Sequence, residues 1–352
     1  MKSTVAIVAT RPETVLEDYR RVMTVAGLLP VAGLDPSTAS SPAASVPLLV
    51  AAGGRGTWPS GTLTPPWQLA GILAALDQEG NEAHSVEVHP VAAPGTGSGP
   101  SAVSGDLWKD LLHRYGARLT DKNAWQPSPA RPAGALPALE AALADGFRLP
   151  RPLRGRRTIL LPVPAAVPGW PVAGGVALLQ SLVAGRLGRP SQVPRSEVRA
   201  EVVDYAREML GEIAAVMDGV YWHVQEDGGS RAVQRNVLLA SNDPVAVDSV
   251  TARLSGLDPL SVPWLRLCRD RGLGAVAPED LRIVGQAELL DLDFLGAGDT
   301  FAPGSGLYAR NPWNRFWWRL TRRRSLERRL AASPWGRWQQ DFCTIRSAGM
   351  SS

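Results

Sequence analysis

Four ionisable residues gather within ten positions of the chain, at Asp218, His223, Glu226 and Asp227. A histidine within reach of carboxylates can act as a general acid or base, because its ordinary pKa lies near neutrality. The sequence therefore predicts a catalytic role for His223 and a ligand-binding role for Asp218. The alternative is a solvated hairpin tip, since the cluster ends in a glycine pair that is typical of a turn.

Three further polar residues, Asn236, Asp243 and Asp248, accompany a predicted strand that reads NVLLAS. Asn236 begins this strand and is interpreted as ligand-binding. Asp243 follows its carboxyl end, where ligands sit in open α/β sheets, so we predict catalytic roles for Asp243 and, one helical turn on, Asp248. Each aspartate has a structural alternative. Asp243 precedes Pro244 and could cap a helix, whereas Asp248 lies among valines and could be paired inside the fold, because an unpaired buried carboxylate is costly.

Two glycine-rich stretches could let backbone amides approach an anion. The first reads GGRG at residues 53–56, between a predicted strand and a predicted helix, and the second is the pair Gly228 and Gly229. Arg55 could add a bidentate contact to a phosphate or carboxylate. We predict that Gly54, Arg55, Gly228 and Gly229 bind ligand. The first stretch fits neither a Walker loop nor a dinucleotide fingerprint, and an ordinary turn is the alternative.

Cysteine content excludes several classes of cofactor site. The chain has two cysteines, Cys268 and Cys343. These are too few for a disulfide framework, a four-cysteine zinc site or a cysteine-ligated iron–sulfur cluster. His223 with Glu226 or Asp227 could bind a metal, but one histidine with loop carboxylates is a weak signal. The sequence thus identifies neither a metal nor a cofactor, and an iron–sulfur cluster is not expected.

The elements that must position these residues follow an α/β pattern. Short apolar runs alternate with segments of helical period, which predicts a mixed, largely parallel sheet flanked by helices. The expected strands cover residues 5–9, 46–51, 85–88, 158–163, 219–223, 236–240 and 281–284. The expected helices cover residues 12–26, 66–78, 106–115, 137–144, 175–184, 195–217, 244–254 and 262–271.

The chain is predicted to divide into an α/β body, residues 1–301, and a basic, tryptophan-rich helical tail, residues 302–352. A break between two lobes of the body near residues 126–155 is an alternative. Residues 310–330 carry eight arginines and one glutamate, a charge of +7, so the rest of the chain carries −3 against the total of +4. Because the basic charge lies in an appendage rather than over the body, nucleic acid is not the expected partner.

The tail places Trp313, Phe316, Trp317 and Leu320 on one helical face. Such a helix could lie on an anionic membrane surface, bind a protein or nucleic acid, or dock onto the body through its tryptophans. We predict residues 310–338 as the contact to a membrane surface or a protein partner. The sequence shows no secretory signal and no apolar run of membrane-spanning length, so a cytoplasmic location is expected, with peripheral membrane association as a variant.

The segment from Met217 to Gly285 contains MDGVYW, then RNVLLASNDPVAVDSVTARLSGLDPLSVPWLRLCRDRGLGAV, and then LRIVG. In this order and spacing it resembles the bacterial and archaeal family called domain of unknown function 362. The match comprises an Asp-Gly pair, an Asn-led strand ending in Ala-Ser, an Asp before a Val-Ala-hydrophobic-Asp helix, and a Gly-Leu-Gly loop. These positions are Asp218, Asn236, Asp243, Asp248 and Gly272 to Gly274. A weaker likeness extends over most of residues 1–286.

Two places depart from the family pattern. The family usually carries Lys-Pro-Asn after its second strand and Lys-x-His after the strand at residues 159–164, where this chain has Ala-Ala-Gly-Gly and Pro-Ala-Ala. Two hypotheses follow. The first is an enzyme or enzyme-derived protein of undefined reaction that binds a small anionic metabolite in one crevice formed by residues 53–56, 218–229 and 236–248. The second is a catalytically silent binding or scaffold protein that uses its basic aromatic tail.

Overall fold

The computed structural model describes residues 2–29, 46–52, 63–78, 86–92, 106–120, 127–143, 146–167, 170–183, 195–226, 229–291 and 332–338. Its main sheet contains β1 (Ser3–Ala9), β2 (Val46–Ala52), β3 (Val86–Ala92), β4 (Arg118–Leu119), β7 (Thr158–Leu161), β10 (Ile213–Glu226), β11 (Gly229–Ser241) and β12 (Leu281–Gly285). Their order across the sheet is β12-β1-β11-β10-β7-β2-β3-β4. β8 (Ala165–Val167) pairs with β10 and with β9 (Trp170–Ala173), while β5 (Pro127–Pro129) and β6 (Arg148–Pro150) form a separate pair.

Strand direction decides where the polar residues lie. β12, β1, β10, β7, β2, β3 and β4 share one direction, whereas β11 is antiparallel to both of its neighbours, β1 and β10. The carboxyl ends of the seven parallel strands therefore define one edge of the sheet, called here the carboxyl edge. The opposite edge, where these strands begin, is called the amino edge, and β11 ends there.

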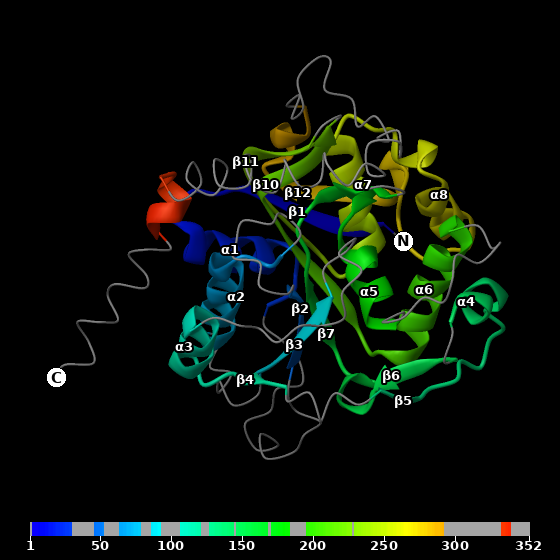
Figure 1. Cartoon of the computed structure of the whole chain (residues 1–352). Coiled ribbons are helices and arrows are strands. Elements are labelled where there is room, and N and C mark those ends of the chain that lie inside the picture. Colours follow the sequence, from blue (N-terminus) through cyan, green and yellow to red (C-terminus); the bar gives the residue numbers. More distant parts are fainter. Residues whose placement is uncertain are drawn as a thin grey trace.

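Helices cover both faces of the sheet (Figure 1). On one face, α1 (Val15–Val25), α2 (Pro66–Gln78) and α3 (Asp106–Arg114) enclose one cluster of buried apolar residues. On the other face, α4 (Pro137–Ala142), α5 (Gly175–Val183), α6 (Arg195–Met209) and α7 (Pro244–Leu254) enclose a second cluster, and α8 (Pro263–Asp270) packs outside them. The sheet is thus the middle of three layers, which is the usual setting for parallel strands.

The sequence of β1 suits a strand that is buried on both faces. Ala6 and Val8 pack in the α1–α2 layer, whereas Val5 and Ile7 pack in the layer of α5 to α7. In the α1–α2 layer the two helices approach so closely that a Cβ at Gly71 would lie 2.3 Å from the ring of Tyr19. This close approach requires glycine at residue 71 and seats the Tyr19 side chain under α2.

A topological switch point lies between β2 and β7, which are adjacent and parallel. After β2 the chain passes through α2 to β3 on one side, and after β7 it passes through α5 and α6 to β10 on the other. α2 and α5 cover opposite faces of the sheet. In open α/β sheets such a reversal leaves a crevice beyond the carboxyl ends of the two strands, where ligands usually bind.

The predicted α/β class, with a mixed and largely parallel sheet flanked by helices, is confirmed. One helix is wrong in part, because the helix expected over residues 195–217 ends at Met209 and residues from Ile213 onward belong to β10. Gly211 passes so close to the backbone of Arg156 that a Cβ would lie 2.9 Å from its carbonyl carbon. The tight turn at Gly211 places residues 213–215 beside β7. These residues are compatible with a helix, but their burial in the sheet favours the strand.

The predicted division of the chain at residue 301 stays a prediction, because residues 292–331 and 339–352 lie outside the described residues. The alternative break near residues 126–155 also stays a prediction. Among the described residues, no helix is both long enough and apolar enough to cross a membrane.

Candidate functional site

The structure separates the predicted site residues onto the two edges of the sheet. Asn236 lies at the carboxyl edge, where its carbonyl accepts from the Thr10 amide at 2.8 Å. Asp243 lies at the amino edge, where the Ser3 hydroxyl donates to its Oδ2 at 2.7 Å. The seven residues of β1 separate these places, about 20 Å of extended chain. The single crevice predicted from the sequence is therefore wrong, because β11 runs against its neighbours.

A buried carboxyl, Asp218, is the centre of the polar contacts at the carboxyl edge. The Tyr19 hydroxyl of α1 and the Trp67 indole N–H of α2 donate to its Oδ2 at 2.5 and 2.6 Å, and the Val220 amide donates to its Oδ1 at 3.0 Å. Burial raises the pKa of Asp218 to about 6, against the opposing effect of these three hydrogen bonds. Burial, with the Asp218 charge, raises the pKa of Tyr19 well above its ordinary 10.0. Asp218 therefore exchanges its proton near neutral pH, while Tyr19 keeps its own.

Polar side chains follow the carboxyl edge from β2 to β12. We call them the polar row: Thr64, Gln68, Asp218, Asn236, Thr10 and Gln286. Thr64 bridges β2 and β7 at the switch point by donating to the Leu161 carbonyl at 2.9 Å. Gln68 bridges β7 and β10 through its Nε2, which lies 3.1 and 2.8 Å from two backbone carbonyls. At the far end, Gln286 Oε1 accepts from the Ala9 amide at 2.6 Å.

Two atoms of the polar row are buried without a hydrogen-bond partner in the part of the chain that the structure describes: Thr10 Oγ1 and Gln68 Oε1. Thr10 is 5% exposed and Gln68 is 0% exposed. A buried polar atom left without a partner costs about 1–3 kcal/mol. Asn236 adds a conformational cost, because its φ of +55° lies in the left-handed region, and such strain clusters at functional sites. The polar row therefore has open positions that a ligand could satisfy.

Residues 332–338, which we call the C-terminal cover, pack against this edge. In Figure 1 this short red helix lies beside α1 and α2, far along the sequence from both. Trp335 is 0% exposed, its indole N–H donates to Asn236 Oδ1 at 3.1 Å, and its ring centre lies 4.9 Å from that of Trp67. The Tyr221 hydroxyl donates to Ser333 Oγ at 3.3 Å. These seven residues thus contact the body, whereas the tail helix expected around Trp313, Phe316, Trp317 and Leu320 lies outside the described residues, and its alternatives stay predictions.

At the amino edge, Asp243 caps α7 and holds the loop that follows α8. Its Oδ1 accepts from the amides of Val245 and Ala246 at 3.0 and 3.1 Å. Its Oδ2 accepts from the Ala275 amide at 2.8 Å as well as from Ser3. With two donors on each oxygen, the carboxylate is satisfied by the fold, as the capping alternative expected. A catalytic role for Asp243 stays a prediction that these contacts do not support.

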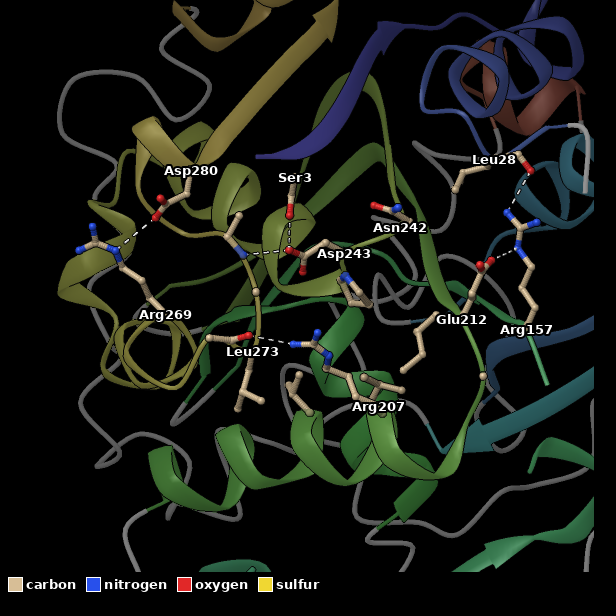
Figure 2. A pocket seen from close by; sticks show the side chains of 18 of the residues that line it. Ser3, Leu28, Arg157, Arg207, Glu212, Asn242, Asp243, Arg269, Leu273 and Asp280 are labelled. Carbon is tan, nitrogen blue, oxygen red and sulfur yellow. Dashed lines mark hydrogen bonds and ion pairs between the residues drawn. The ribbon is translucent and has the colours of Figure 1, made fainter. Parts of the chain in front are cut away.

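An open pocket of about 880 Å³ surrounds Asp243 and is shown in Figure 2. Three arginines line it, and each has a partner. Arg157 pairs with Glu212 at 3.4 Å, Arg269 pairs with Asp280 at 3.2 Å, and Arg207 donates to the Gly272 carbonyl at 3.0 Å. Because basic and acidic groups balance and are already engaged, we interpret this pocket as a structural network.

Asp248 lies inside the fold, with 0% exposure, and holds the start of α5. Its two oxygens accept from the amides of Gly175 and Val176 at 2.8 and 3.0 Å. Burial raises the pKa of Asp248 to about 7, although these hydrogen bonds act in the opposite direction. The contacts fit the alternative of a carboxyl paired within the fold, and a catalytic role stays a prediction. Gly174, where a Cβ would lie 2.2 Å from Asp248 Oδ1, allows this approach.

Several predicted residues fall on parts of the chain that the structure does not describe. Gly54, Arg55 and Gly228 lie outside the described residues, and Gly229 is described only as the first residue of β11. His223 pairs through its backbone with Ala232 and Ala165, and nothing is described of its side chain. β10 and β11 form a hairpin, as the alternative for this cluster expected. Among the described residues, no group of three or more His, Cys, Asp or Glu side chains could hold a metal.

Sequence reasoning missed the residues that surround Asp218. Tyr19, Trp67 and Gln68 lie within the expected helices of residues 12–26 and 66–78, and Thr10 follows the expected strand of residues 5–9, but none of them was predicted as a site residue. The sequence held two signals, the large residue Trp67 and the polar residue Gln68. Both stand in the first turn of the otherwise apolar helix α2, at the end of the helix that meets the edge of the sheet. Trp335 lies within residues 310–338, the predicted contact segment of the tail, but nothing in its spacing indicates its partner.

Comparisons with known proteins identify no family for the chain. No family model matches the sequence, and no curated protein matches it. A crystal structure of a protein from Thermotoga maritima, determined as a structural-genomics target, is similar over 71% of this chain at 11% identity, with a TM-score of 0.39. The match spans 61% of the length of that protein, less than two thirds. The resemblance to the domain of unknown function 362 family therefore stays a prediction.

Proposed function

We propose that the protein binds a small anionic metabolite at the carboxyl edge of its sheet, next to the switch point between β2 and β7, as an enzyme or a protein derived from one. The observation that carries this proposal is the polar row. It supplies a carboxyl with a pKa raised to about 6 at Asp218 and two buried oxygens, at Thr10 and Gln68, that have no hydrogen-bond partner among the described residues. Perturbed ionisation and open polar positions together are typical of a ligand site.

The anionic class of ligand rests on the sequence of residues 53–62, between β2 and α2. β2 ends with Ala52 at this edge, and the chain is described again from Leu63, where the Thr64 amide donates to the Ala51 carbonyl at 3.1 Å. The intervening residues include Gly54 and Arg55, a combination suited to phosphate or carboxylate. The proposed ligand therefore has an anionic group for this loop and donor groups for the polar row.

The chemistry available to the chain's own residues is proton transfer. Asp218 can hold or release a proton near neutral pH, and Tyr19 and Trp67 keep its Oδ2 fixed. General acid or base action requires such a group within hydrogen-bond reach of the reacting atom. Because both oxygens of Asp218 are engaged in the structure, a reaction at this carboxyl requires Trp67 or Tyr19 to yield its hydrogen bond.

The alternative hypothesis, a catalytically silent scaffold protein, depends on the tail. The described part of the tail, residues 332–338, contacts the body of its own chain rather than leaving Trp335 free. Binding of a membrane surface or a protein partner through the arginine-rich residues 310–331 stays a prediction.

The test is a thermal-shift screen of the full chain against phosphorylated and carboxylated metabolites, nucleotides and metals, with Thr10→Val as the diagnostic variant. Valine has the shape of threonine without the hydroxyl, and Thr10 Oγ1 has no partner to lose within the described residues. Thr10→Val is therefore expected to leave the free protein at least as stable, while weakening a hit by about 1 kcal/mol, roughly fivefold in Kd.

Thr158→Val is the matched control, because Thr158 is equally buried but begins β7 at the amino edge and donates to the Arg156 carbonyl at 3.1 Å. This variant is expected to lose stability and keep the ligand response. The proposal is contradicted if hits respond equally to both variants. It is also contradicted if no compound stabilises either the full chain or its Trp335→Ala variant.

A further inference from the structure

The C-terminal cover occupies the part of the carboxyl edge that the proposed ligand needs. Trp335 contacts two members of the site at once, donating to Asn236 of the polar row and packing on Trp67, which itself holds Asp218. Trp338 adds an edge-on contact, with its ring centre 6.4 Å from that of Trp67. Trp67 therefore links the cover to Asp218, because its ring contacts Trp335 and its N–H donates to Asp218.

The cover lies far along the sequence from the elements of the body that it contacts. Forty residues, 292–331, separate it from the last described residue of the body, Asp291. Its described polar contacts to the body include the hydrogen bonds from Trp335 to Asn236 and from Tyr221 to Ser333, at 3.1 and 3.3 Å.

Trp335 is buried with the apolar residues of the α1–α2 layer, and it also makes a polar contact of a kind that a ligand could make. The indole of Trp335 is a flat ring with one N–H. Its ring packs on the ring of Trp67, and its N–H donates to Asn236, whose backbone is strained at a φ of +55°. Gln234 Nε2 donates to the same Asn236 oxygen at 3.0 Å and fixes the orientation of the amide. A flat heterocycle with an N–H donor would meet the same partners.

We propose that the C-terminal cover is an autoinhibitory element, in which Trp335 fills the slot for a flat, N–H-bearing ring of the ligand and must leave before the ligand enters. The part of this inference that concerns the ligand rests on the proposed function. The part that concerns docking and release of the cover does not. The inferred ligand is then an anion that carries a flat heterocycle, whose ring packs on Trp67 and whose N–H donates to Asn236.

Docking is tested without any ligand. Trp335→Ala in the full chain is compared with Trp264→Ala, since both indoles are buried, at 0% and 1% exposure, but Trp264 lies in α8 of the body. Loss of Trp264 is expected to lower Tm by about 6–10 °C. Loss of Trp335 is expected to lower it by less than about 2 °C, because only the cover is released. Equal losses would show that Trp335 is a core residue and would overturn the inference.

Hydrogen exchange gives a second, independent measure of release in the unaltered chain. The amides of Gly336 and Arg337 donate to Ser333 and are expected to exchange at least about tenfold faster than the central amides of β10, through local opening. Exchange of both segments at one common rate, set by global unfolding, would overturn the inference whatever the ligand result.

The ligand arm uses adenosine monophosphate as probe, a phosphate with a flat heterocycle that bears N–H groups, and ribose 5-phosphate as the matched probe without the ring. If the cover is closed about ten times more often than open, Trp335→Ala is expected to lower the Kd of adenosine monophosphate about tenfold. The Kd of ribose 5-phosphate should change less. Equal Kd values for adenosine monophosphate in the full chain and the variant would overturn autoinhibition while leaving the proposed function standing. No binding of either probe to either protein, with release of the cover seen in the exchange experiment, would count against the proposed function and the ring slot but not against docking and release.

Discussion

Replacing Asp218 with asparagine is expected to remove a pH dependence of stability worth about 3 kcal/mol. Burial raises the pKa of Asp218 from 3.8 to about 6, so the folded protein holds this proton more tightly than the unfolded chain does. The stability that this group contributes is therefore complete below about pH 4 and is lost as the pH rises through 6. The difference between the two pKa values corresponds to about 3 kcal/mol.

The assay is urea unfolding of the wild-type chain and Asp218→Asn at several pH values from 4 to 8. At pH 4 the variant should be the less stable protein, because the hydroxyl oxygen of the protonated Asp218 can still accept a hydrogen bond from the surrounding donors, whereas the NH2 group of asparagine cannot. Its deficit should shrink by about 3 kcal/mol by pH 7. Asp248 is present in both proteins, so its titration cancels in the difference. A deficit that stays constant across this range would refute the assignment of a raised pKa to Asp218.

Three further predictions concern the structural carboxylates and one glycine, each checked by equilibrium unfolding. Asp248→Asn should remove a larger pH dependence, about 4 kcal/mol lost between pH 4 and 8, because burial raises the pKa of this carboxyl from 3.8 to about 7; a pH-independent difference from wild type would contradict it. Asp243→Ala should cost about 2 kcal/mol through loss of the α7 cap, without changing any ligand response, and an unchanged stability would count against the cap. Gly274→Ala should cost about 1–3 kcal/mol, because its Cβ would lie 2.4 Å from that of Val245, whereas Gly134→Ala, with nothing within 4 Å, should change stability by less than about 0.5 kcal/mol. Equal effects of the two alanines would refute the packing argument.

The sequence was sufficient for the class of fold and for the positions of most strands and helices. Strands such as β1 are short, β-branched and buried on both faces, a composition that leaves few alternatives. Local chemistry also indicated the Asp243 cap, because an aspartate before Pro244 suits the start of a helix and the structure places it there. These features depend on neighbours in sequence, which is why they can be read from it.

The location of the site could not be read in the same way, because it depends on strand direction. NVLLAS has the same pattern in a parallel and an antiparallel strand, so its carboxyl end was assigned to the wrong edge. One signal was available: Asp227-Gly228 between two apolar runs favours a two-residue hairpin, and a hairpin makes β11 antiparallel to β10. Together with the order of the strands in the sheet, this signal would have indicated that Asn236 and Asp243 lie at opposite edges.

The partners of Asp218 were beyond sequence reasoning for a different reason. Tyr19 and Trp67 lie 199 and 151 positions away from it, and Trp335 reaches the same layer from the tail. Each residue is an ordinary aromatic member of its own segment. These residues come together around Asp218 only after the three segments have packed against one another.

The most direct test of the carboxyl-edge site is hydrogen exchange of the full chain and of Trp335→Ala with and without adenosine monophosphate. We expect the probe to protect peptides covering Thr64 to Leu76 and Met217 to Tyr221, which carry Gln68, Trp67 and Asp218, and to do so more strongly in the variant. Peptides around Asn242 and residues 272–275 of the pocket in Figure 2 should exchange as before. Protection confined to that pocket, or no protection at the carboxyl edge in either protein, would contradict this expectation.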